Sequence, residues 1–158
     1  MKACVLIVLV GLCAAAARAQ QSHGYVFFAP GGSTSRGHTE KIIHLGIGGE
    51  GILGKGVGLG LEIGAVGPTA AFTDGAVGMF SPNGYFHFAR RKTKVDPFVT
   101  AGYTLLFRSG HANLFNFGGG FNYWFSRLGF KAEFRDHVQP RRFGDIHYWE
   151  IRLGLALH

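Results

Sequence analysis

The sequence predicts an all-β protein: a closed antiparallel up-and-down transmembrane β-barrel of eight strands. Apolar side chains alternate with small or polar ones along most of the chain, and Gly and Phe account for 26 and 15 of its 158 residues. Turn-rich segments separate the alternating runs. Alternation is typical of strands, because successive side chains point to opposite faces. Beyond the N-terminal region no apolar run reaches the roughly 18 residues of a spanning helix, so strands are expected to cross the membrane.

Residues 1–19 have the pattern of a cleaved secretory signal peptide. One positive charge precedes an uncharged apolar run, and the small-x-small sequence Ala17-Arg18-Ala19 follows it. The run is shorter than the ~20 apolar residues of a transmembrane helix, so cleavage after Ala19 is expected instead of anchoring. Residues 20–158 are then expected to form one barrel domain, which contains neither cysteine of the chain.

The alternation is clearest between Trp149 and His158. One parity there holds only Trp, Ile and Leu, and the other holds Glu, Arg, Gly, Ala and His. A strand places these two sets on opposite faces. The same split predicts a first strand near 25–29 and further strands at 43–52, 56–66, 79–88, 97–108, 114–125, 128–135 and 148–158.

The face that carries the large apolar side chains indicates which solvent surrounds the barrel. Eight strands enclose an interior just wide enough for side chains to fill. Leu, Ile, Val and Phe at nearly every inward position would therefore overpack a water-soluble barrel. With these residues facing lipid, glycine and polar side chains share the interior, and closure leaves no unpaired edge. A soluble lipocalin-like barrel that binds a ligand is the alternative.

The turns differ in expected length. Short turns are predicted at 53–56 and 125–128, and longer connections are predicted at 31–40, 67–75, 109–113 and 137–147, with 89–96 as an exception. Counted from a periplasmic N terminus, the four longer connections all fall on the extracellular side, as in outer-membrane barrels.

This layout resembles the small eight-stranded outer-membrane barrels of the OmpA and OmpX kind, over the whole of 20–158. The resemblance rests on alternation and not on identical residues. It implies a bacterial outer-membrane location, contact with the outer-membrane assembly machinery, and a non-enzymatic structural, envelope-stability or surface-interaction role. The net positive charge of an exported protein favours anionic lipid head groups or lipopolysaccharide as partners over nucleic acid.

Seven charged residues fall on the parity that faces the interior. Buried charges cost free energy unless they are paired, so we expect an ion-pair network that plugs the lumen. With 137–147 as one loop centred near Arg142, Arg135 is expected to reach Glu150, and Glu133 to reach Arg152. A gate or proton path is the alternative to a rigid plug. The seven candidates are Glu50, Glu62, Lys131, Glu133, Arg135, Glu150 and Arg152.

Other site chemistries have weaker support. None of the eight histidines has zinc-ligand spacing on one element, so neither a metal site nor a cofactor is expected. Asp136-His137 and Ser109-Gly110-His111 supply the residue types of a lipid-modifying enzyme at the barrel rim, which is the alternative function. The glycine-rich stretch 46–51 has no following helix and fails the context of a phosphate loop.

Overall fold

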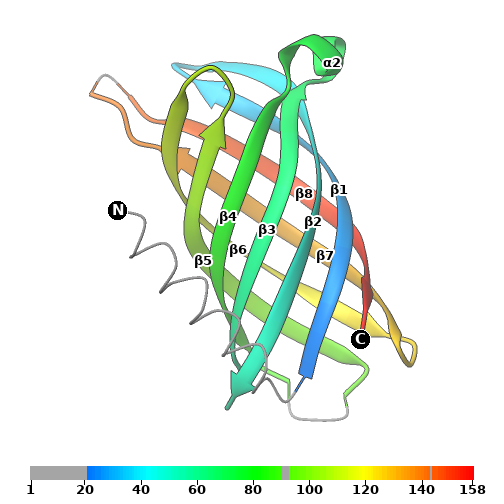
Figure 1. Ribbon diagram of the computed structural model, residues 1–158. Helices are drawn as coiled ribbons and strands as arrows, with labels where there is room; N and C mark the ends of the chain where they lie inside the picture. Colours follow the sequence, from blue (N-terminus) through cyan, green and yellow to red (C-terminus); the bar gives the residue numbers. More distant parts are fainter. Residues whose placement is uncertain (1–20, 90–92, 143) are drawn as a thin grey trace.

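The described part of the chain forms a closed eight-stranded barrel in a computed structural model, which describes residues 21–89, 93–142 and 144–158 (Figure 1). Each strand pairs antiparallel with its sequence neighbours, and β1 pairs with β8 to close the barrel. This confirms the predicted fold class. The strands are β1 (Gln21–Ser35), β2 (His38–Gly54), β3 (Val57–Pro68), β4 (Val77–His87), β5 (Val95–Phe107), β6 (His111–Trp124), β7 (Leu128–Gln139) and β8 (Ile146–Leu157).

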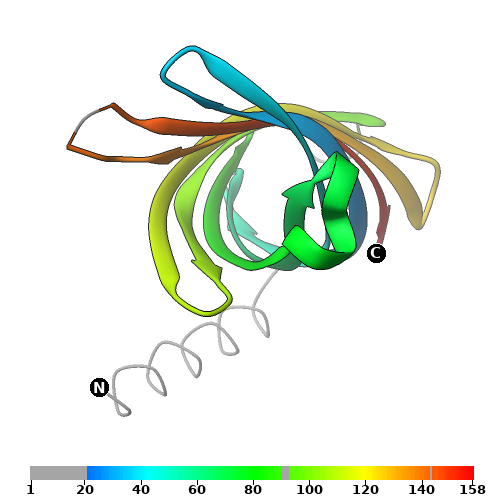
Figure 2. The same ribbon diagram turned by 90° about the horizontal axis from the view of Figure 1, so that it is seen from above.

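Two short helical segments interrupt the strands at one end of the barrel. The 3-10 helix η1 (Thr69–Ala71) and helix α2 (Phe72–Gly75) connect β3 to β4. Figure 2 looks down on this end and shows α2 at the rim of the barrel. Within the described residues, no helix is long and apolar enough to cross a membrane. The signal peptide expected at 1–19 lies outside the described residues.

The exterior of the barrel is apolar and its interior is polar, as the alternation predicts. On β8, Ile151 and Leu153 expose about half of their surface, at 52% and 44%, whereas Glu150 and Arg152 are buried. Large apolar side chains project outward from all eight strands in the same way. A water-soluble barrel would bury this surface, so the soluble alternative does not fit.

The strands are longer than the sequence predicted. The first strand was expected near 25–29 but spans Gln21–Ser35, and the segment 31–40 forms a hairpin end instead of a long loop. Arg36 and Gly37 make its two-residue turn with φ of 49° and 81°, which is the backbone of a type I′ hairpin. Glycine and serine at 31–35 resemble loop composition, yet backbone pairing with β2 extends the strand.

The other long connections shrink for the same reason. The connection expected at 109–113 is 108–110, the one at 137–147 is 140–145, and the one at 67–75 begins as strand and continues as η1 and α2. At the opposite end the connections are 55–56, 88–94 and 125–127. The two ends therefore differ less in loop length than the sequence suggested, and which end faces outward stays a prediction.

Glycines on the inner face of β2 make room for aromatic rings from β1. Phe27 lies opposite Gly46 in the register, and Tyr25 lies opposite Gly48. A Cβ atom at either glycine would come within 2.6 Å of the facing ring, far closer than a normal contact. The high glycine content thus has a steric cause: the narrow interior admits large rings only where the neighbouring strand has no side chain.

Leu153→Arg tests the outward face. Leu153 lies well inside β8, and an arginine on the lipid side near the midplane is expected to cost ~2–4 kcal/mol of unfolding free energy in phospholipid vesicles. Leu53→Arg is the matched control, because Leu53 lies next to the β2–β3 turn, where the cost falls to about 0–1 kcal/mol. Urea unfolding followed by tryptophan fluorescence measures both. Equal stability of Leu153→Arg and the wild type would show that this face does not contact lipid.

Candidate functional site

All seven charged residues expected on the inner face lie in the lumen, and each exposes between 0% and 3% of its surface. Burial of this many charges requires compensating partners. The structure divides the seven into a central cluster around one glutamate, a lysine beside it, and a separate cluster with histidines. They come from β2 (Glu50), β3 (Glu62), β7 (Lys131, Glu133 and Arg135) and β8 (Glu150 and Arg152).

Glu62 is the centre of the network. Its Oε2 accepts hydrogen bonds from Nη1 of Arg135 at 2.6 Å and from Nη1 of Arg152 at 2.8 Å. Its Oε1 accepts hydrogen bonds from the hydroxyls of Tyr25 at 2.6 Å and Tyr85 at 3.1 Å. In the order of the closed barrel β7 lies opposite β3, so these contacts connect opposite walls across the lumen.

Each arginine also binds a carboxylate on its own strand. Nε of Arg135 donates to Glu133, and Nε of Arg152 donates to Glu150. Residues two apart on a strand share a face, which makes these pairs local. The predicted register is confirmed, because Glu133 lies opposite Arg152 and Arg135 lies opposite Glu150. The predicted pairing of side chains across that register is wrong: the guanidinium groups bind along their own strands and across the lumen to Glu62.

Lys131 is held mainly by aromatic rings. Its Nζ lies 3.8 Å from the ring centroid of Phe98 and about 5 Å from those of Tyr25 and Tyr85. The nearest carboxylate oxygen, on Glu133, is 3.8 Å away. The ammonium group has no hydrogen-bond partner in the structure. Attraction to the ring faces compensates part of its lost hydration.

Glu50 belongs to a second cluster, which the sequence did not predict. Nε2 of His87 contacts Glu50, and Nδ1 of the same ring lies 2.7 Å from Asp96 Oδ2. His23 lies 3.6 Å from the other oxygen of Glu50. His23 lies opposite Glu50 in the β1–β2 register, but the first strand was expected to begin only near residue 25. The contact of His87 with Glu50 joins β4 and β2, which are not paired, so the inward parity of His87 was its only signal in the sequence.

A row of hydroxyl, imidazole and carboxylate groups extends from the central cluster. Ser81 Oγ lies 2.8 Å from Thr104 Oγ1, which lies 2.9 Å from Nδ1 of His137, and Nε2 of His137 lies 3.3 Å from Glu150. His44 also contacts Glu150, at 3.0 Å. Enzymes with a serine or threonine nucleophile use the same kinds of group. Here each member is at most 1% exposed, so no substrate reaches the hydroxyls.

An apolar layer separates this polar row from the end of the barrel that carries α2. Buried polar side chains follow two residues closer to the middle of the barrel on four of the strands. They are His44, Ser81, Thr104 and Asn116. The lumen is thus polar in its middle and apolar near one mouth. The layer consists of Ile42, Val66, Met79, Leu106 and Leu114, all buried and in mutual contact.

The candidate enzyme residues do not come together as expected. Asp136 and His137 are consecutive on β7 and so face opposite sides of the wall. Asp136 instead contacts Nδ1 of His147, 2.7 Å away. His111 and Ser109 border the mouth near α2. In the part of the chain that the structure describes, no group of three His, Cys, Asp or Glu side chains is arranged to hold a metal ion.

Comparison with known proteins identifies the architecture. Neither a protein-family model nor the sequence of a curated protein matches the chain. Among solved structures, Neisserial surface protein A matches with a TM-score of 0.70 and 11% identity, over 86% of this chain and 96% of that one. The N-terminal barrel domain of Pseudomonas aeruginosa OprF matches with a TM-score of 0.61 and 19% identity, over 87% and 98%.

The chain has the fold of the small outer-membrane β-barrels. Ail, the attachment invasion locus protein of Yersinia pestis, gives a further match with a TM-score of 0.54 and 12% identity, over 86% of this chain and 97% of that one. Identities this low establish the fold and no activity. For an outer-membrane barrel the apolar exterior is the surface in contact with lipid, and the charged interior is shielded from it.

Glu62→Gln tests the centre of the network in this barrel. The amide is nearly isosteric but leaves Arg135 and Arg152 without their shared carboxylate, so unfolding free energy in vesicles is expected to fall by about 3–5 kcal/mol. Glu40→Gln is the control, because Glu40 is exposed on β2 and its loss is expected to change stability by less than about 0.5 kcal/mol. Similar urea midpoints for the two variants would mean that Glu62 does not stabilise the barrel.

Proposed function

We propose that this protein is a non-enzymatic barrel of the bacterial outer membrane that is closed to ions and has a structural role in envelope stability or surface interaction. One observation carries the proposal: bonded side chains occupy the middle of the lumen and a packed apolar layer crosses it below one mouth. The Glu62 cluster connects opposite walls in the middle, and the apolar layer lies across the lumen near one end.

Conduction is disfavoured by two different barriers. An eight-stranded barrel is just wide enough for its own side chains, whereas aqueous channels are formed by barrels of about 16 strands. The charges of the central cluster are paired with one another, so none of the arginines is free to attract a passing ion. The apolar layer adds a second barrier, because narrow apolar constrictions exclude water and the ions that need it.

The proposed partners follow from the exterior. The outward apolar side chains would contact membrane lipid, and exposed aromatic residues at the strand ends, such as Phe88, Phe125 and Trp149, suit the level of the head groups. Basic residues in the turns would meet anionic lipid head groups or lipopolysaccharide. Insertion would use the outer-membrane assembly machinery.

A lipid-modifying activity has less support than a structural role. The hydroxyl–imidazole–carboxylate row is sealed in the lumen, and Asp136 and His137 lie on opposite faces. Asp136 also contacts His147, whose side chain is about half exposed. Among the described residues, however, no hydroxyl group forms a hydrogen bond with His147 that would supply a nucleophile.

Planar lipid bilayers test the closed lumen. The wild-type barrel is expected to give no steady ion conductance. Arg152→Ala removes a guanidinium group that contacts both Glu62 and Glu150, and we expect it to admit water and produce brief openings. Arg127→Ala, which removes an exposed arginine in the β6–β7 turn, is expected to remain as silent as the wild type. A large and stable wild-type conductance would contradict the proposal and indicate a channel.

A further inference from the structure

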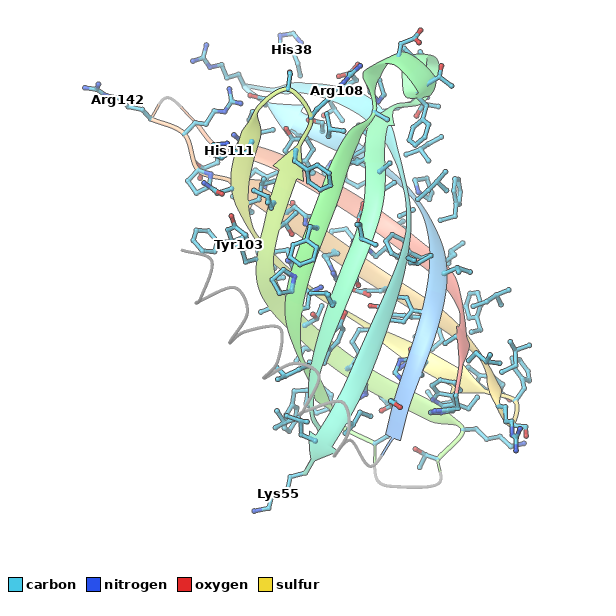
Figure 3. All side chains as sticks on the ribbon, viewed as in Figure 1. His38, Lys55, Tyr103, Arg108, His111 and Arg142 are labelled. Atoms are coloured by element: carbon cyan, nitrogen blue, oxygen red, sulfur yellow. The ribbon has the colours of Figure 1, made fainter. Side chains whose placement is uncertain are left out.

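The mouth of the barrel near α2 contains a hollow of about 460 Å³, lined by residues from all eight strands. This volume falls within the range of small-molecule sites, which is about 300–1,000 Å³. Figure 3 shows Arg108 and His111 at this end of the barrel and Lys55 at the other. The hollow lies above the closed part of the lumen, so a molecule bound there need not pass through the barrel.

The floor of the hollow is apolar, although it opens towards water. Ile42, Val66 and Leu106 of the apolar layer line it directly, and the half-buried Tyr148 packs against the layer from β8. Contact with lipid does not explain why these residues are apolar, because they face the interior. Contact with water does not explain it either, because the interior side chains of such barrels are ordinarily polar. An apolar floor under an open hollow is the arrangement of a site for an apolar group.

Two arginines at the rim are available to bind an external anion. Nη2 of Arg108 donates to the backbone oxygen of Asp74 at 2.7 Å, and Nη2 of Arg141 donates to the side-chain oxygen of Gln139 at 3.3 Å. Both acceptors are neutral, and neither guanidinium has a salt bridge among the described residues. Among the described residues that line the hollow, Glu40 is the one carboxylate, so two arginines face one negative charge there.

We propose that this mouth binds small amphipathic carboxylates, with the hydrocarbon part against the apolar layer and the carboxylate against Arg108 and Arg141. Guanidinium groups bind carboxylates through paired, charge-assisted hydrogen bonds, which fixes the orientation of the ligand. The hydrocarbon part loses its contact with water on the floor. This adds a binding role to the structural one and does not depend on it.

Octanoate is the probe, and the full barrel in lipid nanodiscs is the sample. Methyl NMR separates site binding from partition into lipid, because Ile42 lies on the floor of the hollow and Ile63 faces outward from β3. Octanoate is expected to shift the methyl resonances of Ile42 and Met79 saturably and to leave Ile63 without a saturable shift. Shifts confined to Ile63 would show that octanoate only enters the bilayer, and would overturn the proposal.

Charge recognition is tested with variants and with a probe of opposite charge. Arg108→Gln combined with Arg141→Gln is expected to weaken octanoate binding at least about tenfold, the effect of losing one or two charge-assisted hydrogen bonds. Lys55→Gln removes a charge at the opposite end and is expected to change nothing. Octylamine, with the same chain and a positive charge, is expected to bind more weakly than octanoate. Equal affinities for the two probes would overturn the assignment of the arginines.

A filled hollow supplies the last control. Ala112 lines the hollow from β6, and Ala112→Trp is expected to abolish the saturable shift of Met79. Heat-modifiable gel migration checks that this variant is folded, and the rim variants carry the test if it is not. Unchanged octanoate binding by folded Ala112→Trp would place the ligand elsewhere and contradict the proposal.

Discussion

The carboxylate of Glu62 accepts hydrogen bonds from two arginines on the opposite wall of the barrel, and much of the interior is arranged around that contact. Each guanidinium then has a second carboxylate on its own strand, Glu133 for Arg135 and Glu150 for Arg152. Removing one member leaves the others as buried charges without compensation, so the cluster is stable only as a whole. The neighbouring polar groups connect to the cluster through Glu150, which contacts His44 and His137, and Thr104 and Ser81 follow His137 in the row.

The cluster fits into the narrow lumen because glycines on the facing strand leave space for the aromatic rings around it. Tyr25 donates a hydrogen bond to Glu62, and its ring occupies the space that a side chain at Gly48 would fill. Phe27 occupies the corresponding space at Gly46, and the guanidinium of Arg152 lies over the Phe27 ring at 4.4 Å. The same alternation that turns apolar side chains towards lipid therefore leaves room inside for rings, and the rings support the ionic contacts. The apolar exterior and the polar interior therefore both result from the two-residue alternation of the strands.

The fold was predictable because its signal is local. A period of two assigns Leu153 outward and Arg152 inward without knowledge of any partner, and the Lys55-Gly56 turn was predictable from the short glycine-containing sequence 53–56. The turn at Arg36-Gly37 was missed, because Gly31 and Gly32 belong to a strand only through pairing with β2. The partners of the charges were missed for a similar reason. Contacts between β3 and β7 join strands that are neighbours neither in sequence nor in the sheet, and no local pattern encodes them. Leu106 and Leu114 are apolar residues on the inward parity, which is otherwise small or polar, and only the structure shows that they belong to an apolar layer.

The most direct test of this account is the distance between charged atoms in a lipid bilayer. Solid-state NMR with a ¹³C-labelled Glu62 carboxyl and ¹⁵N-labelled arginine guanidinium groups measures the dipolar couplings that these pairs produce. We expect strong couplings from this one carboxyl to both Arg135 and Arg152, and the loss of one coupling in Arg152→Ala. Couplings too weak for hydrogen-bonded contact with either arginine would contradict it, because the opposite walls of the barrel would then not be connected through Glu62.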